Sequence, residues 1–309
     1  MREPARERGG ASAVRREVAR GALAAGDGLP VALAAILAGV LEAAAEKVGN
    51  VTPTRSFADA RFADFVTSAL VLGPAVARAR PGRVGWAVCK SVEVTRKVTP
   101  TNTNLGLALL FAPIVAAWRS PGGESLRRRL AAVLRDLSVD DARWAYRAIR
   151  LANPGGLGLS AEADVREPPA ITLREAMALA AERDSIASEF VHDFAVTFDV
   201  ALPALRESMR NGLATLDAIA QAHLELIASV PDTLIARKAG RPASERVSAR
   251  ARAVVQAGGM YTRKGRNLAA RLDRYLRRDG NRLNPGTSAD LIAAALFVWL
   301  LGLGGRQGG

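Results

Sequence analysis

The sequence predicts an all-α protein built as a single multi-helix globular domain. Apolar side chains recur every three to four residues along most of the chain, which is the period of an amphipathic helix. Ala and Leu, both strong helix formers, dominate, and no long stretch alternates β-branched with polar residues as a half-buried strand does. With 309 residues, 49% of them hydrophobic, the chain has ample material for one large core.

The same period gives the expected helices in order. They are Arg15–Leu23, Val31–Glu46, Phe57–Ala79, Val84–Val98, Leu105–Trp118, Leu126–Leu134, Asp140–Ala152, a broken segment Leu173–Leu205, Met209–Ser229, Ala243–Ala257, Lys264–Arg278 and Ser288–Leu303. Pro and Gly pairs separate these segments, since both residues interrupt helices. The longest expected loop runs from Asn153 to Pro169.

Domain organisation is expected to be simple, with a charged N-terminal arm over residues 1–20 followed by one all-α domain over residues 21–305. The first twenty residues carry no apolar stretch that reads as an export signal, so we expect a cytoplasmic protein. The apolar runs Leu29–Leu41 and Leu291–Leu303 are shorter than the roughly 18 residues of a membrane span, so we expect buried helices and no membrane partner.

Several kinds of metal site are excluded by composition. Cys89 is the single cysteine, and His192 and His223 are the two histidines, so neither a cysteine-rich zinc site nor a histidine-rich site fits. A metal here would be a hard ion held by oxygen, Mg²⁺ or Mn²⁺.

The formal net charge is +13, from 43 basic and 30 acidic side chains, and nearly all of the excess is arginine. Arginine enrichment accompanies a GC-rich genome, and it also suits a polyanionic small-molecule substrate. A nucleic-acid partner is the weaker hypothesis, because aromatic residues, at 5%, supply few platforms for base stacking.

Three polar turns each lead into an apolar helix. They are Lys47-Val48-Gly49-Asn50-Val51-Thr52-Pro53, Pro100-Thr101-Asn102-Thr103-Asn104 and Asn284-Pro285-Gly286-Thr287-Ser288-Ala289-Asp290. Each turn can be a plain helix cap, or it can present free backbone N–H groups that bind phosphate. If they are functional, all three should converge on one cavity.

Carboxylates with helical spacing add a second group of candidates. Glu189 and Asp193 are four residues apart, Asp184 precedes them, and Asp59 and Asp64 are five apart. Solvated helix faces produce the same spacing, so the pattern alone is not a metal signature. His192 is a candidate acid beside Asp193, and His223 is given no role.

The chain has neither a P-loop nor a Gly-x-Ser-x-Gly elbow. Its motifs instead resemble those of the triphosphoribosyl-dephospho-CoA synthase family, from about Ala43 to Leu300. The blocks are Lys47-Val48-Gly49-Asn50-Val51, Asp59 with Phe65 and Ser68-Ala69, Asn102-Thr103-Asn104-Leu105-Gly106, Arg183-Asp184-Ser185-Ile186-Ala187-Ser188-Glu189-Phe190, Ala201-Leu202-Pro203, Pro231-Asp232-Thr233, Arg237 and Pro285-Gly286-Thr287-Ser288-Ala289-Asp290-Leu291.

The resemblance implies an all-α transferase that joins ATP to 3′-dephospho-CoA and releases adenine, with Mg²⁺ or Mn²⁺ as cofactor. Under it, the residues expected near the metal are Asp59, Asp184 and Asp193, and those near phosphate are Lys47 and Arg237. Asn102, Asn104 and Asp290 are expected to bind base or ribose, with Asn50, Ser68 and Ser288 also in the substrate site. The expected catalytic residues are Asp59, Asp193 and Glu189.

The chain also departs from the better-known branch of this family. It has Phe57 where that branch has histidine, Asn104-Leu105 where it has His-Lys, Val48 where it has proline, and Ser185 where it has glutamate. These changes imply a different acceptor or a related reaction. Chains with Asn-Thr-Asn-Leu-Gly are similar to proteins linked with one-carbon, tetrahydromethanopterin-type cofactor metabolism, which is one alternative.

The other alternative is a non-catalytic basic helical protein that binds nucleic acid or a partner. Its best candidate surfaces are Arg127-Arg128-Arg129 and the segment Arg271–Arg278. Polar blocks at helix starts favour a buried enzyme site, whereas a basic stripe along one helix would favour nucleic acid. We therefore expect an enzyme acting on nucleotides, whose oligomeric state the sequence leaves open.

Overall fold

The computed structural model describes residues 29–154 and 164–302, which form helices joined by turns. These residues contain no β-strand, only an isolated bridge between Thr52 and Arg55. The predicted all-α class is confirmed. The N-terminal arm and the expected helix Arg15–Leu23 lie outside the described residues. No helix in the described ranges is long and apolar enough to cross a membrane.

Helices follow one another closely along the chain. In order they are α2 (Val31–Ala44), α3 (Phe62–Val76), α4 (Val84–Thr95), α5 (Leu105–Arg119), α6 (Leu126–Arg135), α7 (Val139–Ala152), α8 (Leu173–Ala178), α9 (Ser185–Val191), the π-helical turn η1 (Thr197–Ala201), α10 (Leu202–Arg210), α11 (Thr215–Ser229), α12 (Thr233–Ala239), α13 (Arg241–Gln256), the 3₁₀ turn η2 (Gly259–Tyr261), α14 (Arg263–Leu276) and α15 (Gly286–Gly302).

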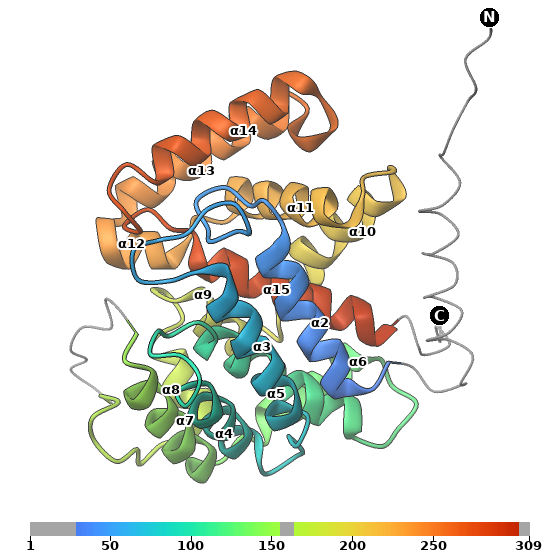
Figure 1. The fold of residues 1–309 in the computed structure, drawn as a ribbon. Helices are drawn as coiled ribbons and strands as arrows, with labels where there is room; N and C mark the ends of the chain where they lie inside the picture. Colours follow the sequence, from blue (N-terminus) through green and yellow to red (C-terminus); the bar gives the residue numbers. More distant parts are fainter. Residues whose placement is uncertain (1–28, 155–163, 303–309) are drawn as a thin grey trace, which may run out of the picture.

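The main core is built around α5 and α15, which are apolar on nearly every side. Buried positions run almost without a break along both helices, so neither has a solvent face. Phe111 of α5 stacks on Phe297 of α15, with ring centroids 4.5 Å apart. Figure 1 shows α15 running through the middle of the molecule, with α2 and α3 in front of it. The expected burial of the run Leu291–Leu303 is confirmed for its described part.

A second, smaller core lies between α11, α13 and α14. Ile227, Val247, Ala251 and Leu272 are among its buried members, and Val48 of the first polar turn joins them. Figure 1 shows α13 and α14 side by side at one end of the molecule, above α11. The first turn is therefore anchored against this helical pair.

Several expected helices differ from the observed ones: α11 begins at Thr215 and not at Met209, α12 was not expected, and two further segments differ more. The helix expected from Phe57 begins at Phe62, because residues before it form a turn and the Asp64 carboxylate accepts from the Arg61 N–H at 2.8 Å. The broken segment Leu173–Leu205 is divided into α8, α9, η1 and α10. Asp193 and Phe194 adopt the left-handed φ angles of 50° and 58°, which end the helical path after α9.

Gly49 provides a test of how the first turn is built. Its φ is +73°, and a Cβ there would lie 2.7 Å from Leu276 Cδ1 and 2.9 Å from Pro285 Cδ. Gly82 has the same φ with no atom within 4 Å. Gly82→Ala should therefore cost about 1–2 kcal/mol of unfolding free energy through backbone strain alone, whereas Gly49→Ala should cost more. Urea unfolding of both variants measures the difference; equal losses would contradict the close packing of this turn.

Candidate active site

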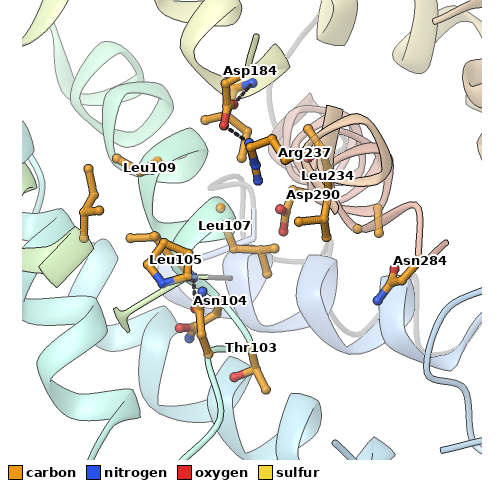
Figure 2. A pocket seen from close by; sticks show the side chains of 18 of the residues that line it. Thr103, Asn104, Leu105, Leu107, Leu109, Asp184, Leu234, Arg237, Asn284 and Asp290 are labelled. Carbon is orange, nitrogen blue, oxygen red and sulfur yellow. Dashed lines mark hydrogen bonds and ion pairs between the residues drawn. The ribbon is translucent and has the colours of Figure 1, made fainter. Parts of the chain in front are cut away.

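The three polar turns meet at one cavity of about 600 Å³. Asn50 comes from the first turn, Asn102 and Asn104 from the second, and Asn284 and Asp290 from the third. The predicted convergence is confirmed. Of the other predicted site residues, Asp59, Asp184 and Arg237 also line this cavity. Figure 2 shows Asn104, Asp184, Arg237 and Asp290 around a common space.

Asp273 of α14 holds the first turn in place. Its Oδ1 accepts from the Gly49 N–H at 2.8 Å, and its other oxygen pairs with Arg55. Arg277, one helical turn later, bonds to the Asp273 carboxylate at 2.9 Å and donates to the Asn50 carbonyl. These bonds use backbone groups of the turn, whereas the Asn50 amide nitrogen lies 3.4 Å from His223 Nε2 at the cavity wall.

The second turn is fixed by a small network of side chains. Asn104 donates to the Thr95 hydroxyl at 2.7 Å, and the Ser68 and Thr103 hydroxyls lie 2.5 Å apart. Asn102 accepts from the Leu105 N–H at 3.2 Å and so caps α5. Ser68 thus supports the turn from behind and does not line the cavity, contrary to the substrate-binding role expected for it.

The third turn depends on the buried carboxylate of Asp232. One of its oxygens accepts from the Ile235 N–H at 3.0 Å, and the other accepts from the Ser288 N–H and hydroxyl at 2.7 and 2.8 Å. Ser288 is therefore engaged inside the protein and does not reach the cavity. Burial raises the pKa of Asp232, and the hydrogen bonds that it accepts act in the opposite direction.

Asp184 and Arg237 form an ion pair across the cavity wall. Asp184 also caps α9, since its Oδ1 accepts from the Ile186 N–H at 2.9 Å and the Ala187 N–H at 3.3 Å. The pair fixes the Arg237 guanidinium beside the cavity, as Figure 2 shows. Arg237 can therefore present its remaining N–H groups to an anion.

Asp290 lines the cavity, and none of the described residues donates a hydrogen bond to its carboxylate. It lies against Gly106, where a Cβ would be 2.1 Å from Asp290 Oδ2. Burial, followed by the charges of Glu42, Asp232 and Asp184, raises its pKa well above the usual range. Asp290 is therefore suited to carry a proton.

Lys47 does not reach the cavity. Its side chain is fully buried and pairs with the Glu42 carboxylate at 2.9 Å. Glu42 itself lines the cavity. Lys47, which was expected to bind phosphate, instead neutralises the Glu42 carboxylate from the side away from the cavity.

Glu189 and Asp193 also lie away from the cavity wall. Glu189 accepts from the N–H groups of Val196 at 2.8 Å and Thr197 at 3.0 Å, which stabilises the start of η1. Asp193 lies beyond the end of α9, so the four-residue spacing does not place the Glu189 and Asp193 carboxylates together. The structure thus offers neither of them contact with a substrate in this cavity.

The described residues contain no group of three or more His, Cys, Asp or Glu side chains able to hold a metal ion. Asp59, Asp184 and Asp193 are thus not assembled as a ligand set. Asp59 is exposed at the cavity and accepts from the Asn281 amide at 3.2 and 3.4 Å. One or two carboxylates with substrate phosphates are the usual ligands of Mg²⁺, and Asp59 at the cavity fits that arrangement.

Sequence reasoning missed Glu42, Asn281 and Lys238, which line the cavity, and it named Asn284 only as part of the third turn. Glu42 is the one charged residue within α2, and a lone carboxylate in an apolar helix is a signal that could have identified it. Asn284 opens the third turn, and its Oδ1 is buried without a hydrogen-bond partner. An unpaired amide beside a cavity is available to a ligand.

The two arginine-rich segments, Arg127-Arg128-Arg129 and Arg271–Arg278, are not free surfaces along their whole length. Arg127 pairs with Asp199 at 2.6 Å, and Arg129 donates to the Ser120 carbonyl at 3.1 Å. Arg277 is directed toward the first turn. The predicted stripes are thus partly used in holding the fold.

His223 gives a prediction for the pH dependence of stability. It is fully buried near Asn50, and burial, with the charge of Lys47, lowers its pKa from 6.5 to about 3. Below pH 6.5 the unfolded chain binds a proton that the folded protein excludes, so this residue should remove about 1.4 kcal/mol of stability per pH unit lost. Chemical unfolding of wild type and His223→Gln should show the two unfolding free energies converging as the pH falls from 7 to 5. A constant difference between the two free energies over this range would rule out a neutral buried imidazole.

Comparison with known proteins gives one consistent result. The sequence profile of the family described as ATP:dephospho-CoA triphosphoribosyl transferase matches residues 30–307. A protein of Stutzerimonas stutzeri named "probable 2-(5''-triphosphoribosyl)-3'-dephosphocoenzyme-A synthase" is 36% identical over 107 residues, 35% of this chain and 36% of that protein. The 2-(5''-triphosphoribosyl)-3'-dephosphocoenzyme-A synthase of Klebsiella pneumoniae is 33% identical over 99 residues, 32% of this chain and 35% of that protein.

The aligned segments thus span about a third of the length of these curated relatives. A crystal structure from Archaeoglobus fulgidus, named for triphosphoribosyl-dephospho-CoA synthase, superposes with a TM-score of 0.58 at 25% identity. It covers 78% of this chain and 99% of its own. Because the family profile covers most of the sequence, and the fold and motif order agree with it, the chain belongs to the ATP:dephospho-CoA triphosphoribosyl transferase family.

Proposed function

We propose that this protein transfers the triphosphoribosyl group of ATP to a hydroxyl acceptor and releases adenine. Family membership supports the reaction class. The observation that carries the proposal is Asp290, a carboxyl group without an internal partner in a cavity that also holds amide and cationic groups.

The reaction breaks the bond between ribose C1′ and adenine N9 and forms a bond between C1′ and the acceptor oxygen. The acceptor hydroxyl loses a proton, adenine gains one, and the triphosphate stays on the transferred ribose. Positive charge develops on the ribose as adenine leaves, as in glycoside cleavage. The protein must therefore donate a proton to adenine and stabilise the positive charge on the sugar.

Asp290 is the residue we assign to proton donation. Its raised pKa keeps the carboxyl protonated at pH values where an ordinary aspartate is ionised. Glu42 and Asp184 contribute to that raised pKa, and each is paired with a cation, Lys47 and Arg237 respectively.

The adenine base is assigned to the end of the cavity that carries amide groups. Asn284 has an amide oxygen without a partner, and Asn50 and Asn281 line the same cavity. Adenine offers an amino donor and ring nitrogen acceptors, which amide side chains can bind. The Asn102 and Asn104 side chains take part in the second turn, so we assign them to shaping the wall near the ribose.

The triphosphate needs both protein cations and a metal. Arg183, Arg237 and Lys238 line the cavity, together with the carboxylates Glu42, Asp59, Asp164, Asp184 and Asp290. Arg237 is already paired with Asp184, so these cationic groups do not neutralise a triphosphate on their own, and a counter-ion would favour its binding. We propose that Mg²⁺ or Mn²⁺ enters with ATP and neutralises the phosphates, with Asp59 as its protein contact. We also propose that this enzyme, with ATP as its substrate, acts in the cytoplasm.

The pH profile tests the role of Asp290. A general acid must be protonated, so activity should fall as the pH rises through its raised pKa. Asp290→Asn should lower kcat by about 10²–10⁴-fold and remove this alkaline limb, because an amide cannot donate the same proton. Adenine release is measured by mass spectrometry with ATP, Mg²⁺ and a panel of hydroxyl acceptors. An unchanged profile in Asp290→Asn would show that another group supplies the proton.

Nucleotide binding tests the metal. Calorimetry should show weaker ATP binding in chelator than in Mg²⁺, and Asp59→Asn should reduce the metal effect by about tenfold, the loss of one charged contact. Asp193→Asn is the matched control, because Asp193 lies away from the cavity and should leave binding unchanged. Equal ATP affinity with and without metal would refute the proposal.

A further inference from the structure

We propose that a basic surface groove between α4 and α7 is a second binding site, separate from the cavity, for a ligand that carries a diphosphate group. The groove has a volume of about 630 Å³, which lies in the range of small-molecule sites. Figure 1 shows α4 and α7 side by side. The charged residues of the groove are Lys90 and Glu93 of α4, Arg96 and Lys97 directly after it, and Arg147 and Arg150 of α7. None of these six residues lines the cavity.

The charge of the groove is strongly positive. Five cationic side chains line it and one carboxylate, Glu93, so four unit charges are left uncompensated. Glu93 binds Lys90 at 2.6 Å and Arg147 at 2.9 Å, and the hydrogen bond from Lys90 is the main cause that lowers its pKa. The C-terminal ends of α4 and α7 lie at the groove, and a helix dipole places only about half a negative unit charge at each end. The side chains therefore outweigh the dipoles, and the groove attracts anions.

Two of the arginines are held in place without losing their charge. Arg96 donates to the Pro100 carbonyl, and Arg150 donates to the Val165 carbonyl. A carbonyl oxygen satisfies a guanidinium N–H but carries no unit charge, and each guanidinium has five N–H groups, so both arginines keep donors for a ligand. Because the fold already orders these side chains, less entropy is lost when a ligand binds.

Trp144 orders two further cations of the groove. The Arg147 guanidinium lies 5.5 Å and the Lys90 ammonium 6.0 Å from the centroid of its ring. Lys97, in contrast, is exposed, and none of the described residues forms a hydrogen bond or an ion pair with its side chain. The groove thus combines ordered cations with one free ammonium group.

A diphosphate matches this arrangement better than a neutral ligand or a single carboxylate. It spreads several negative charges over two linked phosphoryl groups, and guanidinium groups bind phosphoryl oxygens through pairs of N–H groups. Cations come from α4 and the residues after it on one side, and from α7 on the other. Each phosphoryl group can therefore meet cations from one side of the groove.

Two sources of the diphosphate fit the groove. It can belong to the acceptor of the proposed reaction, since dephospho-CoA carries one, or to a free diphosphate compound. Arg96 binds the carbonyl that precedes Thr101, Arg150 binds that of Val165, and both Thr101 and Val165 line the cavity. The anchored arginines thus connect the groove with the cavity wall. Both sources share the same chemistry, and experiment can separate them.

Calorimetry with inorganic diphosphate tests the site on the full chain, without added divalent metal. Diphosphate should bind at least about tenfold more tightly than inorganic phosphate, the ratio given by one further charged contact, and more weakly at high salt. Lys97→Glu should weaken diphosphate binding at least about tenfold. Lys264→Glu is the matched control, because it makes the same change of net charge at an exposed lysine of α14 outside the groove.

Three results would overturn the proposal. Absence of diphosphate binding to the wild type would exclude the site. Equal diphosphate affinity in Lys97→Glu and Lys264→Glu would show that diphosphate binds elsewhere, for example in the cavity. Equal affinity for phosphate and diphosphate would contradict the ligand class. Circular dichroism confirms that both variants fold.

Adenine release with ATP, Mg²⁺ and dephospho-CoA separates the two sources. If the acceptor's diphosphate occupies the groove, Lys97→Glu should raise the KM for dephospho-CoA about tenfold over that of Lys264→Glu, with little change in kcat. If the ligand is a free diphosphate compound, the two KM values should be equal while Lys97→Glu still loses diphosphate binding. The calorimetry needs no turnover, so a failure of adenine release would overturn the proposed function and leave the groove to be judged by binding alone.

Discussion

The Asp232 carboxylate binds N–H groups at the start of two helices, α12 and α15, and the geometry of the cavity depends on it. Its carboxylate accepts from the N–H of Ile235 in α12 and from the N–H and hydroxyl of Ser288 in α15. α12 carries Arg237 to the cavity and α15 carries Asp290. Burying a carboxylate is costly unless its oxygens are hydrogen-bonded, and here both oxygens are. One side chain thus ties together the helices that carry Arg237 and Asp290, the proposed proton donor.

The other polar turns use the same physical device. Asp273 binds the Gly49 N–H, and the Asn104 amide joins the second turn to Thr95 on α4. Capping therefore accounts for part of each turn, and the functional interpretation stays a prediction for the residues beside the caps. One set of polar groups satisfies helix ends and fixes the turns, and Asp290 lines the cavity beside them.

Periodicity predicted the fold class well because most helices here bury an apolar stripe, and Pro and Gly mark their ends. The same pattern placed the three turns, and the structure brings them together. It failed at Glu189 and Asp193, where the four-residue spacing assumed a continuous helix. The left-handed residues Asp193 and Phe194 break that helix, and Glu189 turns back to the N–H groups of η1.

The sequence also did not predict the direction in which several polar side chains point. Lys47 begins the first turn, but nothing local to it shows that its side chain points back to Glu42. Ser68 and Ser288 are polar members of motif blocks, yet each bonds to a partner distant in sequence, Thr103 and Asp232. Such pairings depend on tertiary contacts. Glu42, by contrast, could have been identified from the sequence, because it is a lone charged residue in an apolar helix.

The central proposal is that this cavity binds ATP, with Asp290 beside the bond that breaks. A crystal structure of the full chain with Mg²⁺ and ATP, carrying Asp290→Asn to prevent turnover, tests it most directly. We expect the adenine against Asn284 and the triphosphate toward Arg237, Lys238 and Asp59. Adenine density among Leu109, Leu173 and Met177, or nucleotide bound only in the surface groove of Lys90 and Arg147, would contradict it.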